Sequence, residues 1–200
     1  FIEGMVNRLL DDSDTVSRAL LEKAVLYVVP NMNPDGSIRG HLRTNAVGVN
    51  LNREWQTPSM DKSPEVFLVR ERMLQTGVDM FLDIHGDEAI PYNFVAGSEG
   101  IPSYDQRLAE LEKAFKAALF TITPEFQDEV GYDKDEPGKA NLTVGSNWVA
   151  EQFKCLSYTI EMPFKDNNNY PDPLYGWSPE RSVLFGQDVL AAALAVTDKI

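Results

Sequence analysis

Residues 79–85 read Asp-Met-Phe-Leu-Asp-Ile-His, and residues 156–162 read Leu-Ser-Tyr-Thr-Ile-Glu-Met. Both stretches are short, apolar and rich in residue types that favour strands, and a segment with helical spacing precedes each of them. Strands that alternate with helices favour an α/β domain. In open α/β sheets, ligands bind at the carboxyl ends of the strands. We therefore expect His85 and Glu161, near the ends of these two strands, to share one site.

The remaining elements extend this pattern over the whole chain. Periodicity, caps and proline positions predict helices over residues 2–10, 14–22, 63–77, 103–119, 147–153 and 179–199. Strands are predicted at residues 24–30, 79–85, 92–96 and 156–162, with polar loops over 31–50, 121–141 and 166–178. Ser103 and Gln106 match a capping box at the start of the fourth helix. We therefore predict one α/β domain over residues 1–200, a three-layer sandwich with a mixed central sheet and helices on both faces.

The charge and composition exclude several classes of partner. The formal net charge is -13, and such an acidic surface repels nucleic-acid phosphates. No apolar run approaches the roughly 20 residues that span a bilayer, so no membrane segment is expected. Cys155 is the single cysteine, which rules out an intrachain disulfide and favours a reducing compartment such as the cytoplasm. Its position in an apolar stretch predicts a small core residue.

Glu161 and His85 are the two residues best suited to chemistry. A carboxylate in an apolar strand is costly to bury without a partner, and in a functional site it would act as a general base. The alternative is a strand residue that faces solvent. His85 begins the string His-Gly-Asp-Glu, which has the spacing of a zinc-binding pair with Glu88. That pair needs a third ligand downstream, and the other histidine, His41, lies upstream, so a structural histidine is the alternative here.

A second group of polar residues lies in the loop that follows residue 30. Arg39, Arg43 and Arg53 fall within a short stretch, and Asn52 precedes the last of them. The planar guanidinium group binds a carboxylate through two parallel hydrogen bonds, so these arginines suit a carboxylate-binding site. By composition alone, a solvated face explains them equally well.

These motifs follow one order along the chain: residues 33–36 (Asn-Pro-Asp-Gly), Arg43, Asn52-Arg53, His85 and residues 159–161 (Thr-Ile-Glu). Their order and spacing resemble the zinc metallocarboxypeptidases related to carboxypeptidase A, over nearly the whole chain. The opening Phe-Ile-Glu-Gly and the segment from Asp83 to Glu88 are most similar to the cytosolic carboxypeptidase branch and its bacterial relatives. The resemblance implies the fold of that family, a mixed sheet between two layers of helices.

The resemblance also assigns a role to each matching position. His85 would be the third zinc ligand, and Glu161 would be the general base and acid that activates water. Arg43 would polarise the scissile carbonyl, while Asn52 and Arg53 would bind the free carboxylate at the end of the substrate. The implied reaction is zinc-dependent removal of the C-terminal residue from a peptide or protein tail. These residue types suit that chemistry, because a fixed cation stabilises a developing oxyanion and zinc activates water.

Three features depart from the family pattern. The paired His and Glu ligands of the family lie a few residues upstream of the Glu3-Gly4 seen here. We therefore interpret the chain as an N-terminally truncated catalytic domain that binds zinc poorly and is inactive alone. Asn50 stands where an acidic residue often supports a ligand histidine, and it would be a weaker partner. Tyr132 lies in the region from which a tyrosine closes over the substrate in this family, but its spacing favours an exposed loop residue.

Two other functions fit part of the same pattern. An aspartoacylase- or desuccinylase-type zinc amidohydrolase shares the metal site and an Asn-Arg pair, but the Asn-Pro-Asp-Gly stretch favours a carboxypeptidase. A pseudo-peptidase that binds C-terminal tails does not need the general base that Glu161 offers. Lys134 and Lys139 are candidates for a basic pocket that would suit a glutamate side chain, or alternatively for solvated charges.

Overall fold

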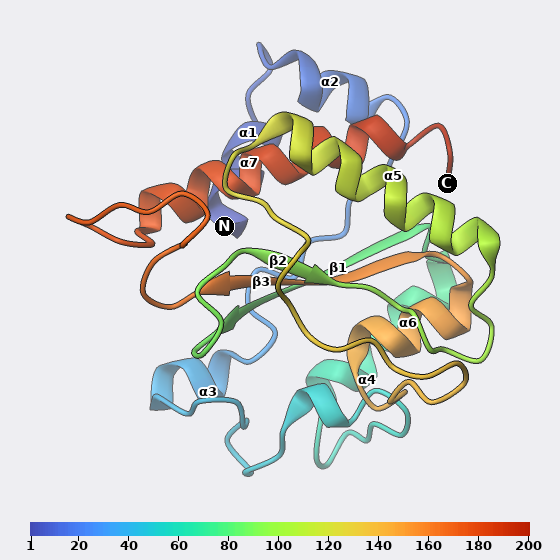
Figure 1. Cartoon of the computed structure of the whole chain (residues 1–200). Coiled ribbons are helices and arrows are strands. Elements are labelled where there is room, and N and C mark those ends of the chain that lie inside the picture. The colour runs from blue at the N-terminus through green and yellow to red at the C-terminus, as the bar shows by residue number, and fades with distance from the viewer.

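A computed structural model describes residues 1–200 and shows a small mixed sheet at the centre of the chain (Figure 1). Strands β1 (Met80–Asp87), β3 (Leu156–Pro163) and β2 (Phe94–Ala96) lie in the order β1-β3-β2. β1 runs parallel to β3, with His85 opposite Glu161, and β2 runs antiparallel to β3. The predicted α/β class with a mixed sheet is confirmed. The strands predicted at residues 79–85 and 156–162 overlap β1 and β3, and the strand predicted at residues 92–96 contains the shorter β2.

One face of the sheet packs against two long helices. Alternation along β3 places Leu156, Tyr158 and Ile160 on this face, and all three are buried. The helices α5 (Gln106–Ile122) and α7 (Pro179–Val196) cover them, forming the upper layer in Figure 1. Both helices contribute apolar side chains to the main hydrophobic core, as the periodicity of the sequence predicted.

The start of α5 differs from the prediction. Its cap is Asp105, whose side-chain Oδ1 accepts a hydrogen bond from the Leu108 backbone N–H at 2.9 Å. Ser103 instead donates both its backbone N–H and its hydroxyl to Oε2 of Glu151. The predicted capping box of Ser103 and Gln106 was therefore wrong, because the carboxylate of a distant residue takes both donors of Ser103.

The opposite face of the sheet is covered by α6 (Gly145–Phe153), with α4 (Pro64–Thr76) on the same side (Figure 1). Trp55 and Trp148 form the centre of this smaller core, with ring centroids 6.2 Å apart. Cys155 is buried in the same cluster, which confirms the prediction of a core residue. Helices therefore lie on both faces and complete the three predicted layers.

Two N-terminal helices, α1 (Ile2–Leu9) and α2 (Thr15–Leu21), pack against α7 and extend the upper layer. Gly4 of α1 lies against the backbone of Val183, and Gly186 of α7 lies against the backbone of the first residue. A Cβ atom at either glycine would clash, so the two helices approach this closely only because both side chains are absent. No helix combines the length and the hydrophobicity that a membrane span requires.

Residues 24–30 do not form a strand, although their sequence predicted one. Val25 and Tyr27 are 80% and 64% exposed, and no backbone hydrogen bond joins residues 25–30 to another segment. β1 also has no neighbouring strand on the side away from β3. A strand needs a hydrogen-bonded partner, so the propensity of these residues was not sufficient. One cavity of about 1770 Å³ is lined by this segment, by β1 and by the polar residues described below.

The predicted loop over residues 31–50 contains a short helix, α3 (Pro34–Arg39). Asn33 caps this helix, since its side-chain oxygen accepts a hydrogen bond from the Gly36 backbone N–H at 3.0 Å. A single 3-10 turn follows at Leu51–Arg53. The loop is therefore more ordered than its composition indicated, and its asparagines account for much of that order.

Candidate active site

His85 and Glu161 lie side by side on β1 and β3. Because they are directly opposite in the register, their side chains leave the same face of the sheet. Nδ1 of His85 lies 3.9 Å from Oε1 of Glu161. The Glu161 side chain is 5% exposed, whereas the His85 side chain is 31% exposed. The structure thus brings together the two residues that the sequence placed near strand ends, with the carboxylate more deeply buried.

Asp83 fixes the orientation of the His85 ring. Its Oδ2 lies 3.0 Å from Nε2 of the ring. Because a carboxylate can only accept, Nε2 carries the hydrogen, and Nδ1 is the nitrogen of the neutral ring that can bind a metal. Burial lowers the pKa of His85, but the hydrogen bond and charge of Asp83 and the charge of Glu161 outweigh it. The pKa therefore lies above its ordinary value. The sequence did not predict this role for Asp83, although residues two apart on a strand share one face and could have indicated it.

The surroundings of Glu161 suit a general base. Burial raises the pKa of its carboxyl to about 7, although the charge of His85 and the hydroxyl of Tyr132 oppose the rise. Oε1 accepts a hydrogen bond from the Tyr132 hydroxyl at 3.1 Å, whereas Oε2 is buried without a protein partner. A buried carboxylate oxygen without a partner is costly when it is charged, and this cost is part of why burial raises the pKa of the group. A pKa near neutrality is what a group needs to accept and return a proton.

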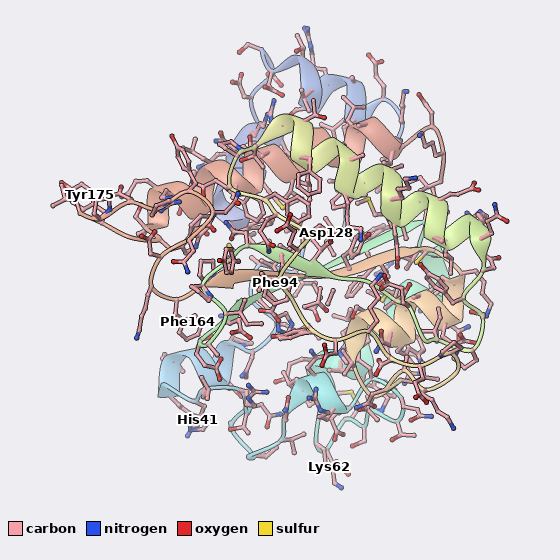
Figure 2. The ribbon with its side chains drawn as sticks, in the orientation of Figure 1. His41, Lys62, Phe94, Asp128, Phe164 and Tyr175 are labelled. Atoms are coloured by element: carbon pink, nitrogen blue, oxygen red, sulfur yellow. The ribbon has the colours of Figure 1, made fainter.

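Tyr132 reaches the same carboxylate from the loop after α5. Its hydroxyl lies 2.7 Å from Oδ2 of Asp87 and 3.1 Å from Oε1 of Glu161. Its ring meets Phe94, labelled in Figure 2, edge-on with centroids 4.9 Å apart. The interpretation of Tyr132 as an exposed loop residue is therefore incomplete, because the side chain is 50% exposed but the hydroxyl lies in the site. No local pattern predicts this contact, and Asp87 was missed for the same reason.

The Asn-Pro-Asp-Gly motif anchors the loop that carries Arg43. Asn33 Nδ2 donates to the carbonyl oxygen of Thr44 at 3.1 Å. Gly36 packs against both the Asn33 side chain and that carbonyl, where a Cβ atom would not fit. The Arg43 side chain is exposed and lines the cavity, and its charge is close enough to His85 to oppose protonation of the ring. The motif therefore holds a guanidinium group near the imidazole.

Asn52 and Arg53 lie in the 3-10 turn. Oδ1 of Asn52 accepts a hydrogen bond from the Gly145 backbone N–H at 2.8 Å, so the amide nitrogen of Asn52 is left to donate to other groups. Arg53 Nη1 donates to the Asn52 carbonyl at 2.6 Å, and its side chain is exposed. Both residues line the same cavity as Arg43. Asn50, which the sequence made a weak partner for a ligand histidine, instead caps this turn by accepting from the Asn52 backbone N–H at 3.1 Å.

Other residues considered from the sequence contribute less to this site. His41 lies beside α3 at the periphery of the molecule (Figure 2). Glu88 is exposed, and residues 1–200 contain no group of three or more His, Cys, Asp or Glu side chains placed to hold a metal ion. The formal pair of His85 and Glu88 therefore does not complete a metal site. Lys134 is paired with Glu99 at 2.7 Å, so much of its charge is already balanced.

Known proteins provide an independent comparison. A family model described as zinc carboxypeptidase matches residues 1–184. An uncharacterized protein of Zymomonas mobilis is 51% identical over 200 residues, which are 100% of this chain and 53% of that protein. Cytosolic carboxypeptidase 6 of Caenorhabditis elegans is 23% identical over 170 residues, which are 82% of this chain and 36% of that protein.

Solved structures agree with these matches. A metallo-carboxypeptidase from Pseudomonas aeruginosa, in complex with (2-guanidinoethylmercapto)succinic acid, is 51% identical with a TM-score of 0.97. The match covers 99% of this chain and 52% of that one. The chain therefore spans about half the length of the Zymomonas and Pseudomonas relatives.

Proposed function

Because the chain belongs to the zinc carboxypeptidase family, we propose that the protein is a zinc-dependent metallocarboxypeptidase that removes the C-terminal residue of a peptide or protein tail. One observation carries this proposal. The buried carboxylate of Glu161 lies 3.9 Å from Nδ1 of His85, in a cavity that Arg43, Asn52 and Arg53 also line. A proton acceptor and a metal-binding nitrogen thus lie side by side, and donors suited to a carboxylate line the same large cavity.

His85 fits a zinc ligand, because Asp83 holds Nε2 and leaves Nδ1 directed towards the side of Glu161. Bound zinc supplies a Lewis acid that polarises the scissile carbonyl and makes water a better nucleophile. Of the three ligands that the family resemblance implies, His85 alone has a match in residues 1–200. We therefore expect residues 1–200 by themselves to bind zinc weakly and to hydrolyse no peptide.

Four residues of this chain would carry out the proton transfer, stabilise the developing negative charge and bind the substrate carboxylate. Glu161 would accept a proton from the attacking water and return it to the leaving amine. Arg43 would donate to the carbonyl oxygen as negative charge develops on it. Asn52 and Arg53 would bind the terminal carboxylate of the substrate. An internal peptide bond has no such carboxylate, so these donors favour an exopeptidase.

Two observations support the finer parts of this proposal. The Pseudomonas relative was solved with a derivative of succinic acid, a compound that carries carboxylates of the kind Asn52 and Arg53 are proposed to bind. Cys155 is buried and free, so nothing in the chain requires an oxidising compartment. We therefore also propose that the protein acts in the cytoplasm.

The test uses the full-length protein. We expect it to contain zinc and to cleave peptides with a free C-terminus, but not the same peptides with an amidated C-terminus. Glu161→Gln should retain zinc and lose roughly a hundred-fold or more in kcat, because the proton acceptor is gone. Glu88→Gln, which removes an exposed carboxylate three residues from His85, is the matched control and should retain both zinc and turnover.

Each rival function predicts a different result. Faster hydrolysis of N-acyl amino acids than of peptides would favour the amidohydrolase. Binding of peptide tails by a full-length protein without zinc or turnover would favour the pseudo-peptidase. Near-normal turnover of Glu161→Gln would remove Glu161 from its proposed role as base.

A further inference from the structure

Asp87, the last residue of β1, uses its two carboxylate oxygens in different directions. Oδ1 accepts hydrogen bonds from the backbone N–H groups of Ala89 at 2.7 Å and Ile90 at 2.6 Å. Oδ2 accepts a hydrogen bond from the Tyr132 hydroxyl at 2.7 Å. Because two backbone donors fix the carboxylate, it is a rigid acceptor for the phenol. Asp87 thereby joins the turn after β1 to the loop that carries Tyr132.

Other contacts hold the loop but not the hydroxyl. The Tyr132 ring lies edge-on to Phe94 at an interplanar angle of 85°. Gly131 packs against the Phe94 ring, since a Cβ atom on this glycine would lie 3.0 Å from Cδ2 of Phe94. Gln127 accepts a hydrogen bond from the Val130 backbone N–H at 2.7 Å and donates to the Val130 carbonyl at 2.8 Å. These contacts place the backbone and one side of the ring, and the carboxylates decide where the hydroxyl points.

The phenol oxygen carries one hydrogen and faces two carboxylates. The two carboxylates compete for this hydrogen, and Asp87, at 2.7 Å, is the stronger acceptor than Glu161, at 3.1 Å. The contact with Glu161 is therefore the weaker one, which can be given up when Glu161 binds water or substrate. The contact with Asp87 does not depend on Glu161. It therefore holds Tyr132 at the edge of the site whether or not Glu161 is bound to water or substrate.

We propose that Asp87 is a positioning residue that holds the hydroxyl of Tyr132 beside Glu161, so that Tyr132 is in place when the substrate enters. This inference rests on the proposed carboxypeptidase function. Asp87 acts through Tyr132 and contacts no reacting atom. Removing the Asp87 side chain should therefore change the kinetics no more than removing the Tyr132 hydroxyl does. Tyr132 lies outside the proposed proton-transfer path, so its loss should weaken substrate binding more than it slows the chemical step.

The experiment compares Asp87→Ala, Asp87→Asn, Tyr132→Phe and the double variant Asp87→Ala/Tyr132→Phe in full-length, zinc-loaded protein. We expect Asp87→Ala and Tyr132→Phe each to raise KM by about ten-fold, the effect of losing one hydrogen bond to a charged group, with kcat little changed. The double variant should be no worse than either single variant, because both remove the same interaction. Asp87→Asn should recover most of the loss, since its oxygen retains the backbone donors and its amide can donate to the phenol. Asp133→Asn, an exposed neighbour of Tyr132, is the matched control and should behave as wild type.

Three outcomes would overturn the inference: multiplicative losses in the double variant, a wild-type KM for Asp87→Ala, or an Asp87→Asn variant as impaired as Asp87→Ala. The third outcome would mean that Asp87 serves only the turn after β1. Amide hydrogen exchange over residues 129–134 provides a readout that does not need activity. Exchange should rise in Asp87→Ala and stay low in Asp87→Asn, and unchanged exchange in Asp87→Ala would contradict the proposal. A wild-type protein that cleaves no peptide would instead remove the proposed function, and the exchange data would still decide the role of Asp87.

Discussion

Replacing Glu161 with Gln should change how the stability of the metal-free protein depends on pH. Burial raises the pKa of this carboxyl from 4.5 to about 7 in the folded chain. The folded state therefore holds a proton over a pH range in which the unfolded state has lost it. The stabilisation from this group is fully present below pH 4.5 and is lost as the pH rises through about 7. The neutral side chain of Gln has no such loss.

The size of the effect follows from the two pKa values. Each pKa unit corresponds to about 1.4 kcal/mol, and between pH 5 and pH 8 the wild type should lose about 2.5 kcal/mol relative to Glu161→Gln. The variant retains an oxygen that can accept the Tyr132 hydroxyl, so the contact at Oε1 is preserved. Urea unfolding of both proteins with a chelator present, at several pH values from 5 to 8, measures the difference in unfolding free energy directly.

Every other titrating group is present in both proteins, so the comparison reports on Glu161 together with its effect on His85, whose pKa the charge of Glu161 raises. Glu22→Gln, at an exposed position on the far end of α2, is the matched control and should follow the wild type at every pH. A stability difference between wild type and Glu161→Gln that stays constant from pH 5 to pH 8 would refute the reasoning. So would a difference that changes in the opposite direction, because it would mean that the folded state favours the ionised carboxylate.

Two further predictions concern the site in the full-length protein. Arg53→Ala should raise KM for peptides with a free C-terminus by about ten-fold or more, because a charge-assisted hydrogen bond to the carboxylate is lost, and an unchanged KM would remove Arg53 from the carboxylate site. Asp83→Ala should weaken zinc binding by roughly ten- to a hundred-fold, because Nε2 of His85 loses the acceptor that orients the ring. Competition with a metal chelator measures this affinity, and unaltered zinc affinity would show that the Asp83 hydrogen bond does not support the ligand.

The parts of the fold that the sequence predicted are those with strong local periodicity. The helices α5 and α7 each place an apolar stripe on the sheet, and the stretch from Leu156 to Pro163 is buried on both faces. In these three elements the observed burial follows the apolar pattern of the sequence, so each could be predicted from its own residues alone. The cap of α5 was mispredicted because the side chain of Ser103 is engaged by Glu151, 48 positions later in the sequence.

The candidate site divides in the same way. His85 and Glu161 were identifiable because a polar side chain at the end of an apolar strand is unusual in itself, whatever lies around it. Asp87 and Tyr132 were not, because each is an ordinary residue in a turn or a loop. They matter because the fold brings the Tyr132 hydroxyl to the Asp87 carboxylate, although the two residues are 45 positions apart in the sequence. Contacts of this kind depend on the packing of loops against a sheet, for which a single sequence carries no periodic signal.

Residues 24–30 are the opposite case: their sequence strongly predicted a strand, and the structure has no strand there. Their β-branched and aromatic side chains favour a strand. A strand forms, however, only where an adjacent segment accepts and donates backbone hydrogen bonds, and residues 25–30 have no such segment beside them. β1 is in a comparable position on the side away from β3, where its backbone also lacks a partner. β1 nevertheless forms a strand, because eight consecutive pairs join it to β3. One hydrogen-bonded neighbour is therefore enough for β1 to form a strand, whereas the strand-like residues 24–30, which have no such neighbour, stay irregular.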